Sequence, residues 1–192
     1  MFEFEELLAI TKNKLLFEKI SEAKKRFVHI FAEVANQISV DSLSKAHQKH
    51  RGIKISKGNE LQHCPYQVLD VLRDFDISRG CNIRILHWWG RGLFVLLFFG
   101  KNHACLSDSK KLIDWARLHD YQICLSDLWA YGKIIDEKKI QESEYFSPEK
   151  FSAHLTNFSH LQLIKAIPIV DMETAGDEIK KEVENILYWM LP

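Results

Sequence analysis

The stretch from Asn82 to Lys101, which reads NIRILHWWGRGLFVLLFFGK, constrains the fold most because it is the most apolar part of the chain. Its second half, residues 93–99, is apolar throughout and predicts a central strand covered on both faces. Gly90-Arg91-Gly92 predicts a tight turn before it, because glycine tolerates positive φ. The first half alternates as a strand does, with Ile83, Ile85, His87 and Trp89 on one face and Asn82, Arg84, Leu86 and Trp88 on the other. We therefore expect a β-hairpin over residues 82–100.

Further strands are expected on both sides of this hairpin. Residues 53–57 alternate in polarity and residues 66–72 are rich in β-forming side chains, while residues 121–125 form a weaker candidate. Residues 161–170 alternate weakly and contain Pro168, which predicts an edge strand because proline donates no hydrogen bond. The segment from 128 to 141 has no clear pattern.

Helices are indicated by apolar residues that recur every three or four positions. Residues 2–39 carry such a stripe, and Asn13 is a candidate cap where a long helix would start. Shorter helices are expected from Asp41 or Ser42 to His50 and from Ser109 to His119. Further helices are expected after Ser147-Pro148 and from Asp177 onward. The apolar face of the long helix also leaves open a dimer seam.

These elements predict the α+β class, with an antiparallel sheet of about five strands flanked by a long N-terminal helix, a central helix and a C-terminal helix. The 192 residues suit one domain. We expect residues 1–192 to form it, with a helical part over residues 2–50 packed on an α+β core of residues 51–192.

Charge and hydropathy exclude several classes of protein. Lys plus Arg and Asp plus Glu both number 26, and a formal charge of zero disfavours nucleic acid as a partner. The longest apolar run, residues 93–99, falls far short of the roughly 20 residues of a membrane helix. The acidic start, MFEFEELLAITK, does not read as a signal peptide. We expect a cytoplasmic protein with no membrane partner.

A candidate ligand site lies where strands 66–72 and 82–89 would pair. This pairing could gather an acid, cations, an imidazole and flat apolar walls, which are the parts of a small-molecule pocket. The candidate ligand-binding residues are Tyr66, Asp70, Arg73, His87, Trp89 and Arg91. The alternative is purely structural: Asp70 and Arg73 form an ion pair, His87 bonds within the sheet, and the tryptophans fill the core.

Other chemistry is only weakly indicated, and neither a catalytic residue nor a metal ligand nor a cofactor is assigned. Cys64 and His87 could form a nucleophile–base pair, but nothing fixes their distance. His47 and His50 could share a zinc ion with His63 or with a carboxylate brought in by folding, although cationic neighbours oppose it. Magnesium on three aspartates and RNA stacking on strands 82–99 are two further weak hypotheses. Those aspartates are Asp70, Asp74 and Asp76, and the cysteines Cys64, Cys81, Cys105 and Cys124 form no CxxC pair.

The segment from Lys57 to Lys101 resembles a family of uncharacterised bacterial proteins. The matching elements are Lys57-Gly58, Pro65-Tyr66-Gln67-Val68-Leu69-Asp70, Arg73, Phe75 and Trp88-Trp89-Gly90. This resemblance covers under a quarter of the chain and implies no activity, because none is associated with that family.

Two functions therefore remain from the sequence. The favoured one is a non-catalytic binding or interaction domain that forms a homodimer through its aromatic surface. The other is a small-molecule-binding protein or enzyme whose site lies near Tyr66, Asp70, Arg73, His87 and Arg91. The first is favoured because no nucleophile–base pair or metal-ligand set has persuasive spacing.

Overall fold

A computed structural model describes residues 2–191 as an α+β fold built on one seven-stranded antiparallel sheet. The strand order is β1-β2-β3-β4-β7-β5-β6. The strands are β1 (Lys54–Leu61), β2 (Cys64–Arg73), β3 (Cys81–Trp88), β4 (Gly92–Gly100), β5 (Gln122–Cys124), β6 (Ile140–Glu142) and β7 (His160–Ile167). The α+β class is confirmed, but the expected count of about five strands is too low. One of the strands, β6, begins in the segment from 128 to 141 that has no readable pattern.

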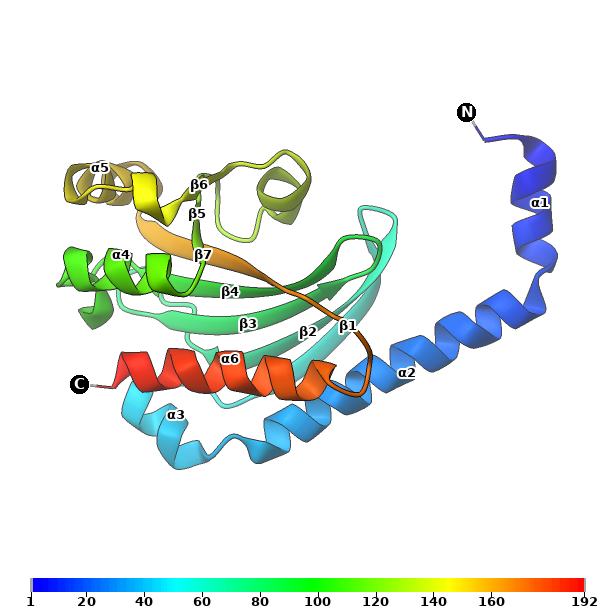
Figure 1. Ribbon diagram of the computed structural model, residues 1–192, viewed down its shortest axis with the longest axis horizontal. Coiled ribbons are helices and arrows are strands. Elements are labelled where there is room, and N and C mark those ends of the chain that lie inside the picture. Colours follow the sequence, from blue (N-terminus) through cyan, green and yellow to red (C-terminus); the bar gives the residue numbers. More distant parts are fainter. Residues whose placement is uncertain (1, 192) are drawn as a thin grey trace.

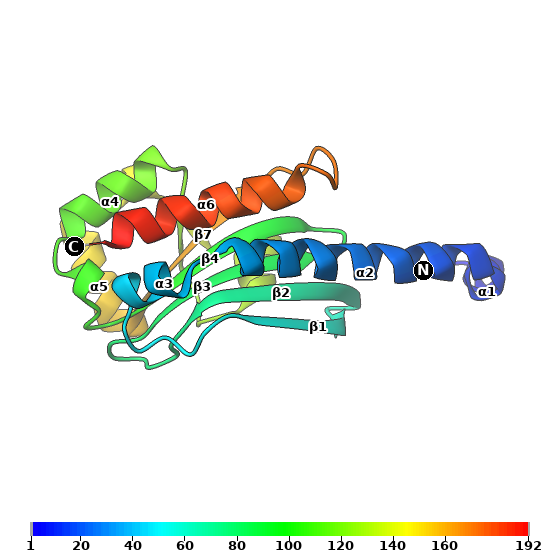
Figure 2. The ribbon, with the colours of Figure 1, turned by 90° about the horizontal axis from the view of Figure 1, so that it is seen from below.

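The helices gather mainly on one face of the sheet, where α2 and α6 lie side by side (Figures 1 and 2). The α-helices are α1 (Phe4–Lys12), α2 (Lys14–Gln37), α3 (Val40–Ala46), α4 (Ser109–Leu118), α5 (Pro148–Phe158) and α6 (Ala175–Met190). Short helical turns are η1 (Ala104–Leu106), η2 (Gly132–Asp136, a π-helix) and η3 (Ser143–Tyr145). Every helix in the described range 2–191 is too short or too polar to cross a bilayer.

The expected hairpin is confirmed: β3 and β4 pair in antiparallel register, and Gly90 adopts a φ of 76° in the turn between them. The apolar run of β4 is central, because β3 and β7 flank it on either side. The edge position expected for residues 161–170 is wrong, since β7 lies between β4 and β5. Pro168 directly follows the last residue of β7, so it limits the strand's length rather than its place in the sheet.

The long N-terminal helix is interrupted at Asn13, whose side chain accepts a hydrogen bond from the Leu16 N–H at 3.0 Å. The buried residues of α2 are Phe27, Ile30, Phe31 and Val34, all in its second half, which packs on the sheet. The first half of α2 projects from the body and carries α1 at its tip (Figures 1 and 2). We call residues 2–20 the arm.

The sheet has a core on each face. The larger core joins the sheet to α2, α3, α4, α5 and α6, and includes Phe31, Ile85, Val95 and Ile186. The smaller core lies on the opposite face, where residues 129–140 cover Val68, Leu86, Trp88, Leu96 and Ile164. We call these the helix face and the loop face.

Candidate functional site

The register of β2 against β3 divides the candidate ligand-binding residues between the two faces. Tyr66 pairs with Trp88, Gln67 with His87, and Asp70 with Arg84. Tyr66 packs in the core of the loop face, whereas the ring of His87 stacks on Phe27 of α2 with centroids 3.6 Å apart. The six residues therefore do not line one shared pocket.

On the loop face, a buried ion pair joins Asp70 to Arg84. Arg84 Nε donates to Asp70 Oδ1 at 2.7 Å, and its Nη2 donates to Oδ2 at 3.0 Å. The third guanidinium nitrogen donates to the hydroxyl of Tyr131 at 2.7 Å. Burial alone would lower the pKa of Arg84, but the bonds to Asp70 and Tyr131 outweigh burial and raise it. This bidentate ion pair offsets the desolvation cost of burying the two charges.

Aromatic rings enclose the same guanidinium. Its Cζ lies 4.2 Å from the Trp129 ring centroid and 5.8 Å from that of Phe75. Trp129 adopts a φ of 61°, which is a strained conformation for a bulky residue. A hydrogen bond of 3.0 Å from the Trp129 N–H to the buried Gln162 side chain holds it there. Together these contacts fix residues 129–131 over Arg84.

The expected Asp70–Arg73 ion pair is wrong. Arg73 instead donates to the backbone carbonyls of Gly52 at 3.0 Å and Arg51 at 2.7 Å. Arg73 thus ties the segment before β1 to the end of β2. Arg84 lies directly across the ladder from Asp70, whereas Arg73 follows a register shift between Asp70 and Leu72 and pairs with Asn82 near the strand end.

On the helix face, the side-chain amide oxygen of Gln67 meets both His87 and Trp89. Gln67 Oε1 lies 2.9 Å from His87 Nδ1 and 2.9 Å from Trp89 Nε1. Indole nitrogen can only donate, so the Gln67 atom that it meets must be the carbonyl oxygen. His87 Nδ1 must then be a donor as well, and the Gln67 amide nitrogen is left as a donor without a partner among the described residues. Burial lowers the pKa of His87 to about 4, so its ring is neutral near pH 7.

Arg91 lies at the hairpin end of the loop face. Its guanidinium meets both carboxylate oxygens of Asp136, at 3.2 and 3.1 Å, and stacks 4.1 Å from the Trp88 ring centroid. Arg91 Nη1 also donates to Cys64 Sγ at 3.1 Å. The hypothesis of a Cys64–His87 nucleophile pair is therefore wrong, since the thiol faces Arg91 while His87 lies on the helix face.

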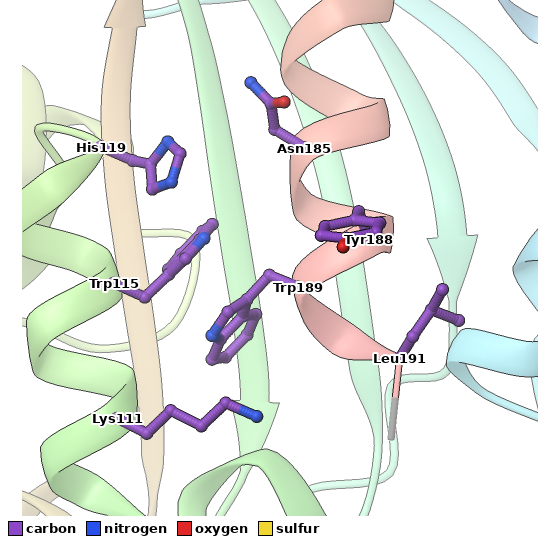
Figure 3. A pocket seen from close by; sticks show the side chains of 7 residues that line it. All are labelled: Lys111, Trp115, His119, Asn185, Tyr188, Trp189 and Leu191. Atoms are coloured by element: carbon purple, nitrogen blue, oxygen red, sulfur yellow. The ribbon is translucent and has the colours of Figure 1, made fainter.

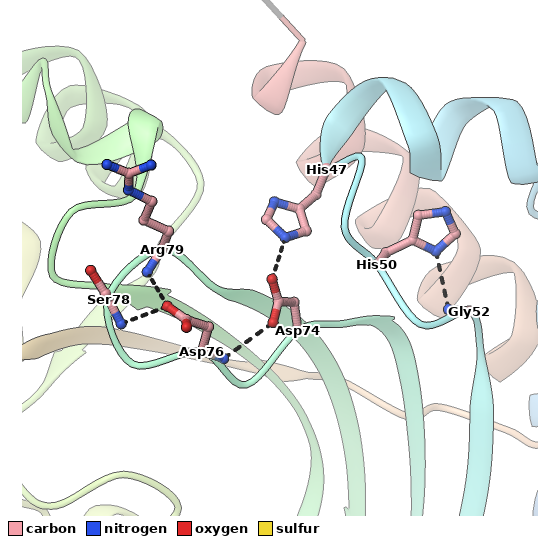
Figure 4. Close-up of polar contacts among 7 residues, drawn as sticks. All are labelled: His47, His50, Gly52, Asp74, Asp76, Ser78 and Arg79. Carbon is pink, nitrogen blue, oxygen red and sulfur yellow. Dashed lines mark hydrogen bonds and ion pairs between the residues drawn. The ribbon is translucent and has the colours of Figure 1, made fainter.

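The histidine hypothesis for a metal site is also wrong, as Figure 4 shows. His47 Nε2 bonds to Asp74 at 2.8 Å, while His50 Nδ1 accepts from the Gly52 N–H at 3.1 Å. His63 lies before β2 and Asp74 after it, so the third expected ligand lies at the opposite end of that strand. Helix α3 ends at Ala46, which removes the helical spacing expected of His47 and His50.

The three aspartates proposed for magnesium point to separate partners. Asp70 binds Arg84, and Asp74 binds His47. Asp76 accepts backbone N–H bonds from Ser78 and Arg79 at 2.9 and 2.6 Å (Figure 4). In the range 2–191, no three His, Cys, Asp or Glu side chains are close enough to hold one metal ion.

The aromatic side chains expected on the surface of strands 82–99 are largely buried. Trp88, Phe98 and Phe99 are each fully buried, so they cannot stack on nucleic-acid bases. Exposed aromatic residues occur elsewhere, among them Phe2, Phe4 and Phe17 on the arm and Tyr188, which lines a groove of about 610 Å³ between α4 and α6 (Figure 3). There Trp115 stacks on Trp189 with centroids 4.4 Å apart, and this stack joins the two helices.

A second groove, of about 740 Å³, runs between α2 and strands β1 and β2. We call it the basic groove, because Lys24 and Lys25 of α2 and Lys57 of β1 line it. The partner-free amide of Gln67 also lines this groove. Sequence reasoning missed Gln67 and Arg84 as polar centres, although strand alternation had placed Arg84 on the face opposite His87.

No protein-family model matches the chain, and neither does any curated protein sequence or solved structure. The resemblance to a bacterial family stays a prediction. Function is therefore inferred from the geometry of this chain alone.

Proposed function

We propose that the chain is a non-catalytic interaction domain that forms a homodimer through its arm. The observation that supports this proposal is the exposure of large apolar side chains on residues 2–20. Phe2 and Phe4 are 78% and 77% exposed, and Leu15 is 58% exposed. The other exposed apolar residues of the arm are Leu7, Leu8, Ile10 and Phe17. Exposed apolar side chains concentrated in one segment in this way support an interaction site.

The size of this surface suits a protein interface. A buried aromatic side chain removes roughly 150–250 Å² from water, so three phenylalanines can bury on the order of 450 Å² or more. A stable interface buries roughly 800 Å² on each partner. The four aliphatic residues of the arm can supply much of the remainder.

The charges of the arm favour a second copy as the partner. Its first part carries Glu3, Glu5 and Glu6 with no basic residue, while residues 12–19 carry Lys12, Lys14 and Lys19 with only one glutamate. Two arms in antiparallel orientation would set the acidic part of each against the basic part of the other. Such complementarity selects the partner and its orientation. The acidic tip also opposes docking on an anionic lipid surface.

The arm projects from the body, so its apolar residues can be changed without disturbing the core. Phe4 and Leu8 are one helical turn apart and share a face of α1. We expect the chain to have a dimer mass in light scattering after gel filtration. Replacing both residues by glutamate should give a folded monomer whose thermal unfolding midpoint no longer depends on protein concentration.

Leu118→Glu on α4 is the matched control, because Leu118 is equally exposed (77%) but lies off the arm. This variant should remain dimeric. A wild-type monomer at every concentration tested would overturn the proposal, and so would a dimer that survives both arm substitutions.

The proposal includes a cytoplasmic location. Cys64, Cys81, Cys105 and Cys124 are all free thiols, which supports a reducing compartment.

A further inference from the structure

The basic groove combines a cavity of ligand size with a cationic lining. Its volume of about 740 Å³ lies within the range of small-molecule sites. Lys24, Lys25 and Lys57 supply three ammonium groups, and His29 lies beside them. The described lining residues include no carboxylate, and Lys24 and Lys57 form no ion pair within the described residues.

The lysines are held differently from one another. Lys24 Nζ donates to Asn59 Oδ1 at 3.0 Å, which steers it across the groove toward β1. Lys25 Nζ lies 3.8 Å from Glu22 Oε2, and both side chains of this pair are exposed. Lys57 makes no ion pair with any residue in the range 2–191. Lys24 and Lys57 are therefore the ammonium groups that can reach a common anion.

Gln67 adds an amide donor to this lining. Its side chain is only 1% exposed, and Trp89 and His87 fix the direction of its amide oxygen. The amide nitrogen must then point away from both, and no described group accepts from it. Because Gln67 lines the groove, this N–H is available to donate to a ligand oxygen there.

We propose that the basic groove binds a phosphorylated small molecule, whose phosphate group is held by Lys24, Lys57 and the amide of Gln67. A phosphate monoester carries a charge of about −1.5 to −2 near pH 7, which two ammonium groups offset. Lysine binds phosphate as a point charge, whereas arginine's planar fork suits carboxylates equally well. The described lining contains no arginine.

The surroundings favour one compact anion over a nucleic-acid strand. Glu22 and Glu33 stand next to the groove, paired with Lys25 and His29. These carboxylates would repel a backbone of successive phosphates on either side of a central one. The chain as a whole also has a formal charge of zero.

Calorimetric titration of the full chain with pyrophosphate tests this proposal. Lys24→Gln and Lys57→Gln remove charge but keep most of the stem, and each should weaken binding at least tenfold. Lys139→Gln is the control, because Lys139 is exposed and lies outside the groove. It should bind as the wild type does. Absence of binding, or equal affinity in all variants, would overturn the proposal.

Two competing titrations test the class of ligand. Citrate that binds as tightly as pyrophosphate would show a carboxylate site instead, and tighter binding of a single-stranded RNA oligomer would show a nucleic-acid surface. Either result overturns the proposal. The Gln67 side-chain amide signals in a ¹⁵N–¹H spectrum should shift when pyrophosphate is added. If these signals stay constant while backbone signals of β1 shift, Gln67 is excluded from the site.

This inference is independent of the homodimer. Lys57→Gln should leave the mass in gel filtration unchanged, so failure of one proposal leaves the other intact.

Discussion

The two halves of the N-terminal helical region carry similar apolar stripes but have opposite surroundings. In the second half of α2, Phe27, Ile30, Phe31 and Val34 are buried against the sheet. In the arm, Phe4 and Leu8 lie one turn apart on α1 but are exposed. A helix stripe indicates that a partner exists, yet it does not say whether the partner is the chain's own sheet or another molecule. The buried residues of α2 stabilise the fold, whereas the exposed residues of the arm are available for an interface.

Truncating one phenylalanine in each half should give the largest contrast. Phe31 is fully buried, so Phe31→Ala should destabilise the fold by about 3–5 kcal/mol through lost burial and a cavity. Phe4→Ala should leave the free energy of unfolding of the monomer within about 0.5 kcal/mol. Urea unfolding at low protein concentration measures both values. Equal losses in the two variants would mean that the arm belongs to the folded core.

The same contrast applies to charges. Asp70 and Arg84 have side chains only 6% and 15% exposed, whereas those of Lys14 and Glu18 on the arm are 89% and 58% exposed. Asp70→Asn leaves the Arg84 charge buried without a counterion and should cost about 3 kcal/mol. Lys14→Gln should cost less than about 0.5 kcal/mol.

Urea unfolding of these two charge variants is again the measurement. A small loss in Asp70→Asn would indicate that water reaches Arg84, and it would reopen the loop face as a ligand site.

Replacing a buried histidine and an exposed one should change the pH dependence of unfolding differently. This is the smallest expected effect among the three pairs of variants. Neither ring nitrogen of buried His154 has a partner among the described residues, and burial lowers the pKa of His154 from 6.5 to about 4. Between pH 6.5 and about 4, His154 therefore binds a proton in the unfolded chain but not in the folded chain. Stability conferred by the neutral ring is lost as the pH falls from 6.5 toward 4.

His154→Phe should raise the free energy of unfolding by about 1 kcal/mol at pH 7 and flatten its decline between pH 6.5 and 4. His29→Phe on the exposed face of α2 should change neither value. Thermal unfolding across this pH range distinguishes the two variants. An unchanged pH dependence in His154→Phe would place the titrating group elsewhere.

Much of the fold could be predicted because its signals are local. The glycines at 90 and 92 predict the hairpin, and Asn13, Asp108 and Ser147 cap the helices that follow them. Strand order is not local, so the edge position of residues 161–170 was wrongly predicted from Pro168. The π-helix and the start of β6 lie in a segment whose sequence shows no period.

The candidate site could be predicted less well than the fold. Alternation within β3 correctly separates Arg84 from His87, but it cannot fix the register against β2. Register decides that Asp70 meets Arg84 and not Arg73. The contacts of Trp129 and Tyr131 with Arg84 span more than 40 positions, and no sequence pattern indicates them.

Native mass spectrometry of two charge-reversed chains tests the homodimer most directly. One chain carries Glu3→Lys, Glu5→Lys and Glu6→Lys, and the other carries Lys12→Glu, Lys14→Glu and Lys19→Glu. We predict that each chain alone is monomeric, because both parts of its arm then carry net charge of the same sign, and that their mixture forms a heterodimer. A dimer of either reversed chain alone, or a mixture that remains monomeric, would contradict arm pairing by complementary charge.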